Sequence, residues 1–98
     1  MIRHIILIKF KATTKTNEIN ELKASFESMP LKVGGVHSVE WGLNDSPEGK
    51  NKDYTHVVLM NFIDDAGRKN YLPHPEHGEL KKLFRLILED LIVFDYTV

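Results

Sequence analysis

Apolar residues gather in four extended runs along this 98-residue chain. The runs cover Ile2–Phe10, about Val36–Asn44, Tyr54–Phe62 and about Leu91–Tyr96. They are rich in isoleucine, valine and aromatic residues, which favour strands, and Gly, Pro, Asn or Asp residues lie between several of them. The pattern therefore predicts four β-strands.

Between the first two runs, apolar positions recur every three or four residues, which is the spacing of an amphipathic helix. The apolar stripe consists of Ile19, Leu22, Phe26 and Met29. Thr16 or Asn17 would cap this helix at its start. Pro30 and the Gly34-Gly35 pair are expected to end it.

A second helical region lies between the third and fourth runs. Asp64 or Asp65 would cap a short helix that reaches Tyr71, and Pro73 would break it. Pro75 suits the first turn of a further helix. The apolar face of that helix is formed by Leu80, Leu83, Phe84, Ile87 and Leu88.

The resulting order is strand, helix, strand, strand, helix, strand. This is the ferredoxin-like βαββαβ pattern of an α+β protein, with one antiparallel sheet and its helices on one face. A chain of this length allows one domain, which we expect to cover residues 1–98.

Three of the four expected strands are apolar on both sides. In the first, Ile5 and Leu7 oppose Ile6 and Ile8, and the third and fourth runs alternate in the same way. Helices on one face leave the other apolar face open, and a large open apolar surface is a liability. The simplest cover is the sheet of a second subunit, so we expect a homodimer. Misjudged strand ends are the alternative explanation of the pattern.

Charge and cysteine content limit which kinds of binding partner this chain is expected to have. The formal net charge is −1, which argues against nucleic acid, because phosphate binding needs a basic surface. There is no cysteine, so there is no disulfide framework and no thiolate metal site. No signal peptide, lipidation motif or membrane-spanning run is apparent, so we expect a cytoplasmic protein without a membrane partner.

One short segment combines a tyrosine with two histidines at the junction of two helices. Tyr71, His74 and His77 lie here, with Pro75 between the histidines. If Pro75 is the first helical residue, His77 is the third and meets the positive end of the helix dipole, which disfavours its charged form. A neutral imidazole is what a general base requires near pH 7. The His74/His77 spacing also permits a metal site, but no third ligand is apparent nearby.

Two more histidines, His4 and His56, lie within strands among apolar neighbours. Such a histidine needs a hydrogen-bond partner or a functional reason. Either one alone is readily explained as a satisfied core histidine. Together with Tyr71 and His77 they form a hypothesis: four polar rings converging on a pocket between sheet and helices.

Other chemistry is not indicated. The chain has neither a nucleophile elbow nor a Gly-rich phosphate loop, and we expect no cofactor. The Asp64-Asp65 pair is interpreted as helix capping. Lys81 and Lys82 are interpreted as a solvated helix face.

Four segments together resemble the stress-responsive A/B barrel domain (Dabb) family. They are His4–Lys11, Tyr54–His56, the Tyr71–His77 junction with its His-Pro-x-His core, and Phe94–Tyr96. The resemblance covers almost the whole chain. It implies a ferredoxin-like fold paired into a dimeric α/β barrel.

The family includes a plant polyketide cyclase that works by cofactor-free aldol condensation. The resemblance implies His77 as the catalytic base and Tyr71 as a hydroxyl that polarises a carbonyl, with His4, His56 and His74 in or beside the binding pocket. The leading interpretation is thus a small-molecule pocket, with cyclase-like or lyase activity if the protein is an enzyme. The alternatives are a non-enzymatic stress-responsive structural or ligand-holding protein, and a cofactor-free monooxygenase of the same barrel fold.

Overall fold

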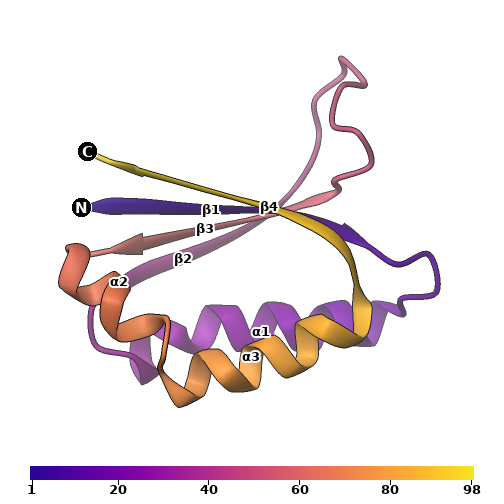
Figure 1. Ribbon diagram of the computed structural model, residues 1–98. Helices are drawn as coiled ribbons and strands as arrows, with labels where there is room; N and C mark the ends of the chain where they lie inside the picture. The colour runs from indigo at the N-terminus through magenta and orange to yellow at the C-terminus, as the bar shows by residue number, and fades with distance from the viewer.

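The computed structural model describes all 98 residues and has one four-stranded sheet with three helices (Figure 1). The elements in chain order are β1 (Ile2–Phe10), α1 (Thr16–Lys32), β2 (Val36–Leu43), β3 (His56–Phe62), α2 (Asp65–Tyr71), α3 (Pro75–Ile87) and β4 (Leu88–Thr97). The strand order is β2-β3-β1-β4, and all neighbouring strands are antiparallel. The predicted ferredoxin-like α+β fold is confirmed.

The helices lie on one side of the sheet, and the loop between β2 and β3 rises on the other side (Figure 1). We call the helix-covered side the inner face and the opposite side the outer face. The register places Ile2, His4, Ile6 and Ile8 of β1 on the inner face, because alternate residues of a strand point to the same side.

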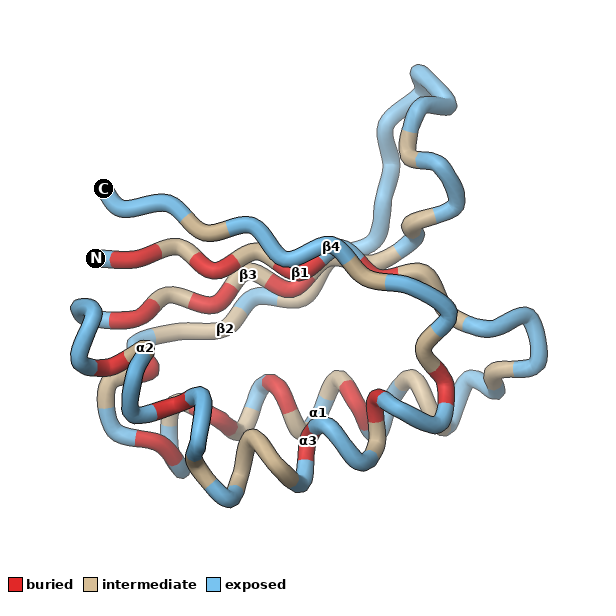
Figure 2. Tube along the Cα trace, viewed as in Figure 1, coloured by how far each residue is buried: buried red, intermediate tan, exposed pale blue.

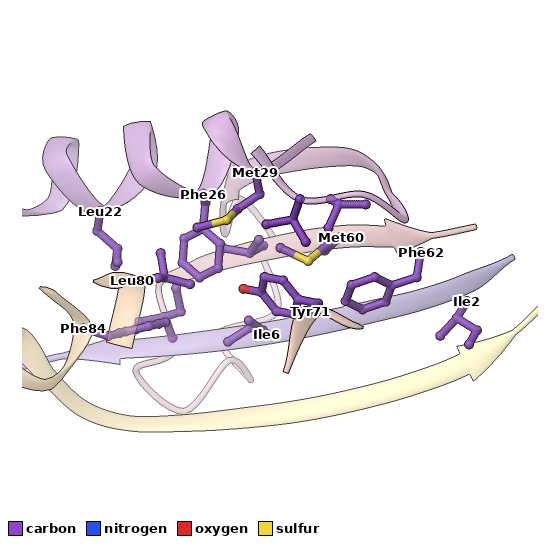
Figure 3. Close-up of a cluster of buried hydrophobic side chains, with 14 of the residues drawn as sticks. Ile2, Ile6, Leu22, Phe26, Met29, Met60, Phe62, Tyr71, Leu80 and Phe84 are labelled. Carbon is purple, nitrogen blue, oxygen red and sulfur yellow. The ribbon is translucent and has the colours of Figure 1, made fainter. Parts of the chain in front are cut away.

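The hydrophobic core lies between the inner face and the helices (Figures 2 and 3). Its largest fully buried side chains are Tyr71, Phe26, Phe62, Ile8, Leu22, Met29, Met60 and Leu80. The stripe expected on α1 accounts for Leu22, Phe26 and Met29, so helical periodicity identified this part of the core. β4 is an edge strand and contributes no fully buried residue (Figure 2).

Several element boundaries differ from the sequence prediction, including the start of β3, which lies at His56 and not at Tyr54. α1 begins one residue after Lys15, whose backbone N–H donates to the Glu18 carboxylate at 2.9 Å, rather than after Thr16 or Asn17. The helix also continues past Pro30 to Lys32. A proline cannot donate the i→i−4 backbone hydrogen bond and crowds the carbonyl four residues earlier, but Pro30 lies in the last turn, where little of the helix follows it. β4 begins at Leu88, directly after α3, with no turn residues to mark the change.

Two glycines fix the position of α2 against the start of β2. Gly35 has φ of +93°, and a Cβ placed on it would lie 2.5 Å from the Gly67 Cα. A Cβ on Gly67 would in turn lie 2.9 Å from the Gly35 carbonyl oxygen. The two backbones therefore meet without room for a side chain. This contact fixes the position of α2, the helix that ends in Tyr71, against the start of β2.

The outer face carries no helix (Figure 1). Leu7, Ile92, Phe94 and Tyr96 are exposed there, Phe94 at 62%. The register aligns Leu7 with Val57 on one side and with Ile92 on the other, so the apolar patch crosses three strands. The two-sided apolar pattern of the strands is thus a property of the sheet and not an error of strand boundaries.

None of the three helices has the combination of length and apolarity that crossing a bilayer requires.

Candidate functional site

A cavity of about 250 Å³ lies between α3 and the β1–β4 edge of the inner face. We call it the inner cavity. Most of its lining is apolar, with residues such as Phe26 and Phe84. Its polar lining residues are His4, Tyr71, His77 and Lys81.

The helix junction that precedes α3 is built as the sequence predicts. Pro75 is the first residue of α3, and His74 is the capping residue. The Nδ1 atom of His74 accepts a hydrogen bond from the Glu76 backbone N–H at 3.1 Å. His74 is not among the residues that line the inner cavity, so its observed contact is with the start of its own helix. His77 is the third residue of α3 and does line the cavity.

A backbone contact fixes the tautomer of His77. Its Nδ1 atom lies 2.8 Å from the Leu72 carbonyl oxygen. A carbonyl oxygen only accepts, so Nδ1 must carry the hydrogen and donate it. In the neutral ring the Nε2 atom then keeps its lone pair, which is the acceptor that a general base needs.

The pKa of His77 is lowered from the ordinary histidine value. Burial of the ring is the largest cause, and the positive charges of Lys81 and His4 lower it further, whereas the hydrogen bond to Leu72 opposes the shift. The predicted resistance of His77 to protonation is therefore confirmed in direction. Burial of the ring was not among the predicted causes of this shift and is the largest one.

The Tyr71 hydroxyl is buried and has no hydrogen-bond partner in the protein. Its side chain ends α2, is only 1% exposed, and packs on the His77 ring with 4.4 Å between ring centroids. Burial raises the pKa of Tyr71 far above the ordinary tyrosine value, so the hydroxyl stays protonated and remains a donor. A buried hydroxyl without a partner costs about 1–3 kcal/mol, so it calls for an explanation.

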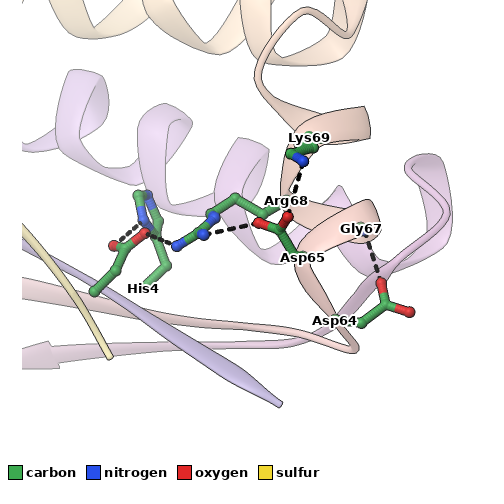
Figure 4. Close-up of polar contacts among 7 residues, drawn as sticks. His4, Asp64, Asp65, Gly67, Arg68 and Lys69 are labelled. Atoms are coloured by element: carbon green, nitrogen blue, oxygen red, sulfur yellow. Dashed lines mark hydrogen bonds and ion pairs between the residues drawn. The ribbon is translucent and has the colours of Figure 1, made fainter. Parts of the chain in front are cut away.

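His4 is held by a chain of charged groups that ends on α2 (Figure 4). Its Nδ1–H donates to one oxygen of Asp95 at 2.6 Å, and Asp95 is its direct neighbour across the β1–β4 pair. The other Asp95 oxygen accepts from Arg68 at 3.1 Å, and Arg68 also donates to Asp65 at 2.8 Å. This arrangement leaves the Nε2 atom of His4 available at the inner cavity.

His56 lies elsewhere. It lines a second hollow of about 420 Å³ where the β2–β3 loop overhangs the outer face, together with Leu7, Val57 and several loop residues. We call this the outer hollow. The His56 ring itself lies on the inner face, because His56 pairs with the inner-face residue Ile8. The ring packs against Phe10 and Trp41 at the edge of the core. Its Nδ1 lies 2.7 Å from the Thr55 hydroxyl. Burial alone lowers its pKa.

The structure therefore brings three of the four expected rings together, namely His4, Tyr71 and His77. It does not bring His56 into the inner cavity, because His56 lies at the far end of β3 from Met60, the residue paired with His4. The interpretation of Asp64 as a capping residue is confirmed, since it accepts from the Gly67 N–H at 2.8 Å.

Three residues of the site were missed in the sequence. Asp95 has a usable signal, because it is an acidic residue in register with the inner-face positions Leu91 and Val93. Arg68 had no signal of its own, since its contact with Asp95 depends on how α2 docks. Lys81 was interpreted as solvated, and it is exposed, but it also lines the mouth of the inner cavity.

No group of three or more histidine, aspartate or glutamate side chains is arranged as a metal-ligand set.

The fold and the cavity define a class: small ferredoxin-like α+β domains with a pocket between sheet and helices. The chain belongs to the stress-responsive A/B barrel domain family, whose family model matches residues 2–98. Among characterised relatives it is similar to olivetolic acid cyclase from Cannabis sativa, at 27% identity over 96 residues, which is 98% of this chain and 95% of the relative.

Solved structures agree with this assignment. A crystal structure of At3g17210 from Arabidopsis thaliana superposes with a TM-score of 0.93 at 26% identity, covering 100% of this chain and 95% of that one. A dimeric ferredoxin-like protein from Bacteroides fragilis gives a TM-score of 0.81 at 26% identity, with 99% and 95% covered. The hydroxynitrile lyase of Passiflora edulis shares the fold, with a TM-score of 0.91 at 22% identity and 99% and 92% covered.

Proposed function

We propose that this protein binds a compact, largely apolar carbonyl compound in the inner cavity and acts on it as a cofactor-free lyase or cyclase. In this proposal His77 is the general base and Tyr71 the donor that stabilises an enolate oxygen. A base and a donor suffice for proton removal next to a carbonyl, so the step needs no further group. The similarity to olivetolic acid cyclase supports the cyclase-like form of the reaction.

The observation that carries the proposal is the buried, unpartnered Tyr71 hydroxyl beside a histidine whose Nε2 is free to accept. A ligand carbonyl supplies the acceptor that the hydroxyl lacks. Because the hydroxyl is buried, the carbonyl reaches it only when a neighbouring side chain moves aside. The low pKa of His77 keeps its Nε2 lone pair available near neutral pH.

The proposed chemical step is a simple proton transfer. The Nε2 atom of His77 removes a hydrogen as H⁺ from the carbon next to the carbonyl. The electron pair of that C–H bond forms the C=C bond of an enolate, and the carbonyl π electrons move to the oxygen. The Tyr71 O–H donates to this oxygen, and His4 offers its Nε2 to a polar group of the ligand. The enolate carbon then attacks a second carbonyl or takes a proton back from His77.

Benzylacetone (4-phenylbutan-2-one) in D₂O is a suitable probe, because it joins an aromatic ring to a ketone with exchangeable neighbouring hydrogens. We expect the ring resonances of His77 to shift on titration while those of His56 stay in place. We also expect deuterium to enter the ligand faster than in buffer. If no His77 resonance moves and no exchange is accelerated, this function is overturned.

A non-enzymatic role is favoured by a different observation, the His4–Asp95–Arg68 chain, which ties β1, β4 and α2 together. In a non-enzymatic protein the rings of His4, Tyr71 and His77 would stabilise the fold by packing and hydrogen bonding. Thermal melting separates the two functions: a structural role predicts that His77→Ala lowers the melting temperature and that no ligand raises it. The enzymatic role predicts that benzylacetone raises the melting temperature of the wild type.

We further propose that the protein works as a homodimer, with the outer faces of two sheets packed together. The open patch around Leu7, Ile92 and Phe94 is the kind of surface that monomers rarely leave exposed. The Bacteroides fragilis protein of the same fold is described as dimeric. A second copy covers the patch without requiring any further element of the chain.

A further inference from the structure

We propose that Lys81 is a specificity residue that binds a carboxylate of the ligand held in the inner cavity. This inference rests on the function proposed above and names the substrate class more closely: a compact carbonyl compound that also bears a carboxylate. It follows from where Lys81 lies, from its lack of a counter-ion, and from the otherwise apolar lining around it.

Lys81 lies one helical turn after His77 on α3, so the two residues share a face of that helix. Long side chains of a helix lean toward its N-terminus, which directs the Lys81 stem toward the His77 turn. Both residues line the inner cavity. Side chains four positions apart on a helix have Cβ atoms about 5–6 Å apart. One small ligand can therefore place its carboxylate at the Lys81 ammonium and the carbon that loses a proton at His77.

Lys81 is the only lysine, arginine, aspartate or glutamate that lines the cavity, and it makes no ion pair. Its neighbour Lys82 pairs with Glu79 at 3.0 Å, and Glu76 pairs with Lys32 at 3.7 Å. The Asp95 carboxylate, which pairs with the cavity residue His4, is already taken by His4 and Arg68. A cation without a partner at the mouth of an apolar cavity is suited to an anionic group of the ligand.

The charge of Lys81 is already felt at the base, since it is one of the causes, after burial, that lower the pKa of His77. A carboxylate bound to Lys81 offsets that charge when the ligand is in place. The apolar stem of the lysine can meanwhile cover part of the cavity wall. The cavity volume of about 250 Å³ restricts the ligand to a small molecule.

The test compares 3-phenylpropionate with 3-phenylpropionamide, two probes of nearly equal shape that differ by one charge. Dissociation constants are read from the shift of the His77 ring resonances. We expect the wild type to bind the carboxylate about 10-fold more tightly than the amide at low salt, and this preference to shrink as salt is added. Lys81→Met keeps the apolar stem and should remove the preference while amide binding is unchanged.

Lys82→Met is the matched control, because Lys82 is adjacent on the helix, pairs with Glu79 and does not line the cavity. It should keep the full preference for the carboxylate. Equal binding of the two probes to the wild type, or an unchanged preference in Lys81→Met, overturns the role of Lys81 but leaves the inner cavity standing as a ligand site. If neither probe moves the His77 resonances, both the site and this inference fail.

Discussion

The two hollows of the molecule lie on opposite faces of one sheet and contain the same kinds of side chain. Each has in its lining a histidine whose pKa is lowered by burial, although the His56 ring lies on the inner face and His56 only borders the outer hollow. Each also has a tyrosine nearby: Tyr71 at the inner cavity and Tyr54 at the outer hollow. The outer hollow is also the larger, at about 420 Å³ against about 250 Å³. Because the side chains are of the same kinds, size alone would favour the outer hollow as the functional site.

The difference lies in which polar groups are already satisfied. The Tyr54 hydroxyl donates to Asp90, and the His56 ring meets the Thr55 hydroxyl through its Nδ1. At the inner cavity the Tyr71 hydroxyl has no partner. Unsatisfied buried groups cost free energy and persist where another requirement maintains them, so the smaller hollow is the better candidate for chemistry. The outer hollow lies on the face that we assign to the partner subunit.

Removing the Tyr71 hydroxyl should give the largest difference in effect between a substitution at the inner cavity and one at the outer hollow. Tyr71→Phe should slow benzylacetone exchange by about 10²–10³-fold, the cost of losing one donor to an oxyanion. The same change should raise the free energy of unfolding by about 1 kcal/mol, because it deletes an unsatisfied buried group. Denaturant unfolding and the exchange rate measure the two effects.

His56→Gln is the counterpart at the outer hollow. It should leave the exchange rate within a factor of about two of the wild-type rate. Only the loss of the residue that acts as general base is expected to slow exchange by ~10²–10⁴-fold. A large loss in His56→Gln, or none in Tyr71→Phe, would reverse the assignment of the two hollows.

A charge on the outer face should weaken subunit association. Leu7→Asp places an unpaired carboxylate in the centre of the apolar patch, and burying it without a partner is costly. We expect the dimer dissociation constant, measured by analytical ultracentrifugation, to rise at least about 100-fold. Leu31→Asp is the control, because Leu31 is 95% exposed on α1, away from this face. Dissociation by both variants, or by neither, would count against the assigned interface.

Neutralising a carboxylate should matter more at the inner cavity than at the outer hollow. Asp95→Asn weakens its bonds to His4 and Arg68 and should lower the free energy of unfolding by about 1–3 kcal/mol. Asp90→Asn alters only the exposed contact with Tyr54. It should change the free energy of unfolding by less than about 1 kcal/mol. Equal effects in the two variants would show that the His4 chain contributes no special stability.

Acid pH should destabilise the fold through His77 and His56, whose pKa values are lowered in the folded protein. Their folded pKa values lie below that of the unfolded chain, so below about pH 6.5 the unfolded state binds more protons and stability falls as pH decreases. Salt distinguishes the sites: screening of Lys81 and His4 should raise the pKa of His77, whereas the pKa of His56, shifted by burial alone, should stay unchanged. NMR titration at two salt concentrations measures both. A salt response at His56 equal to that at His77 would remove this distinction.

Much of the fold could be predicted from the sequence because each element carries its own periodicity. The α1 stripe of Leu22, Phe26 and Met29 identified core residues directly. The start of β4 could not be found, because α3 passes into it at Leu88 without a turn residue. The end of α1 was predicted only approximately: the helix passes Pro30 and ends at Lys32, before the Gly34-Gly35 pair.

The site was predictable only where it is local. Tyr71 and His77 lie six positions apart on one junction, so their meeting follows from short-range structure. His4 and Asp95 are 91 positions apart and meet through strand register, which a hydrophobic pattern alone does not specify. His56 shares a face with the core residues of β3, yet its distance along the strand excludes it from the cavity.

The most direct test of the account is the rate of hydrogen–deuterium exchange next to the benzylacetone carbonyl, measured by NMR in the wild type and in His77→Gln. The account predicts acceleration by the wild type and a loss of about 10²–10⁴-fold in a variant that remains folded. Exchange by folded His77→Gln at the wild-type rate would contradict the assignment of His77 as the base.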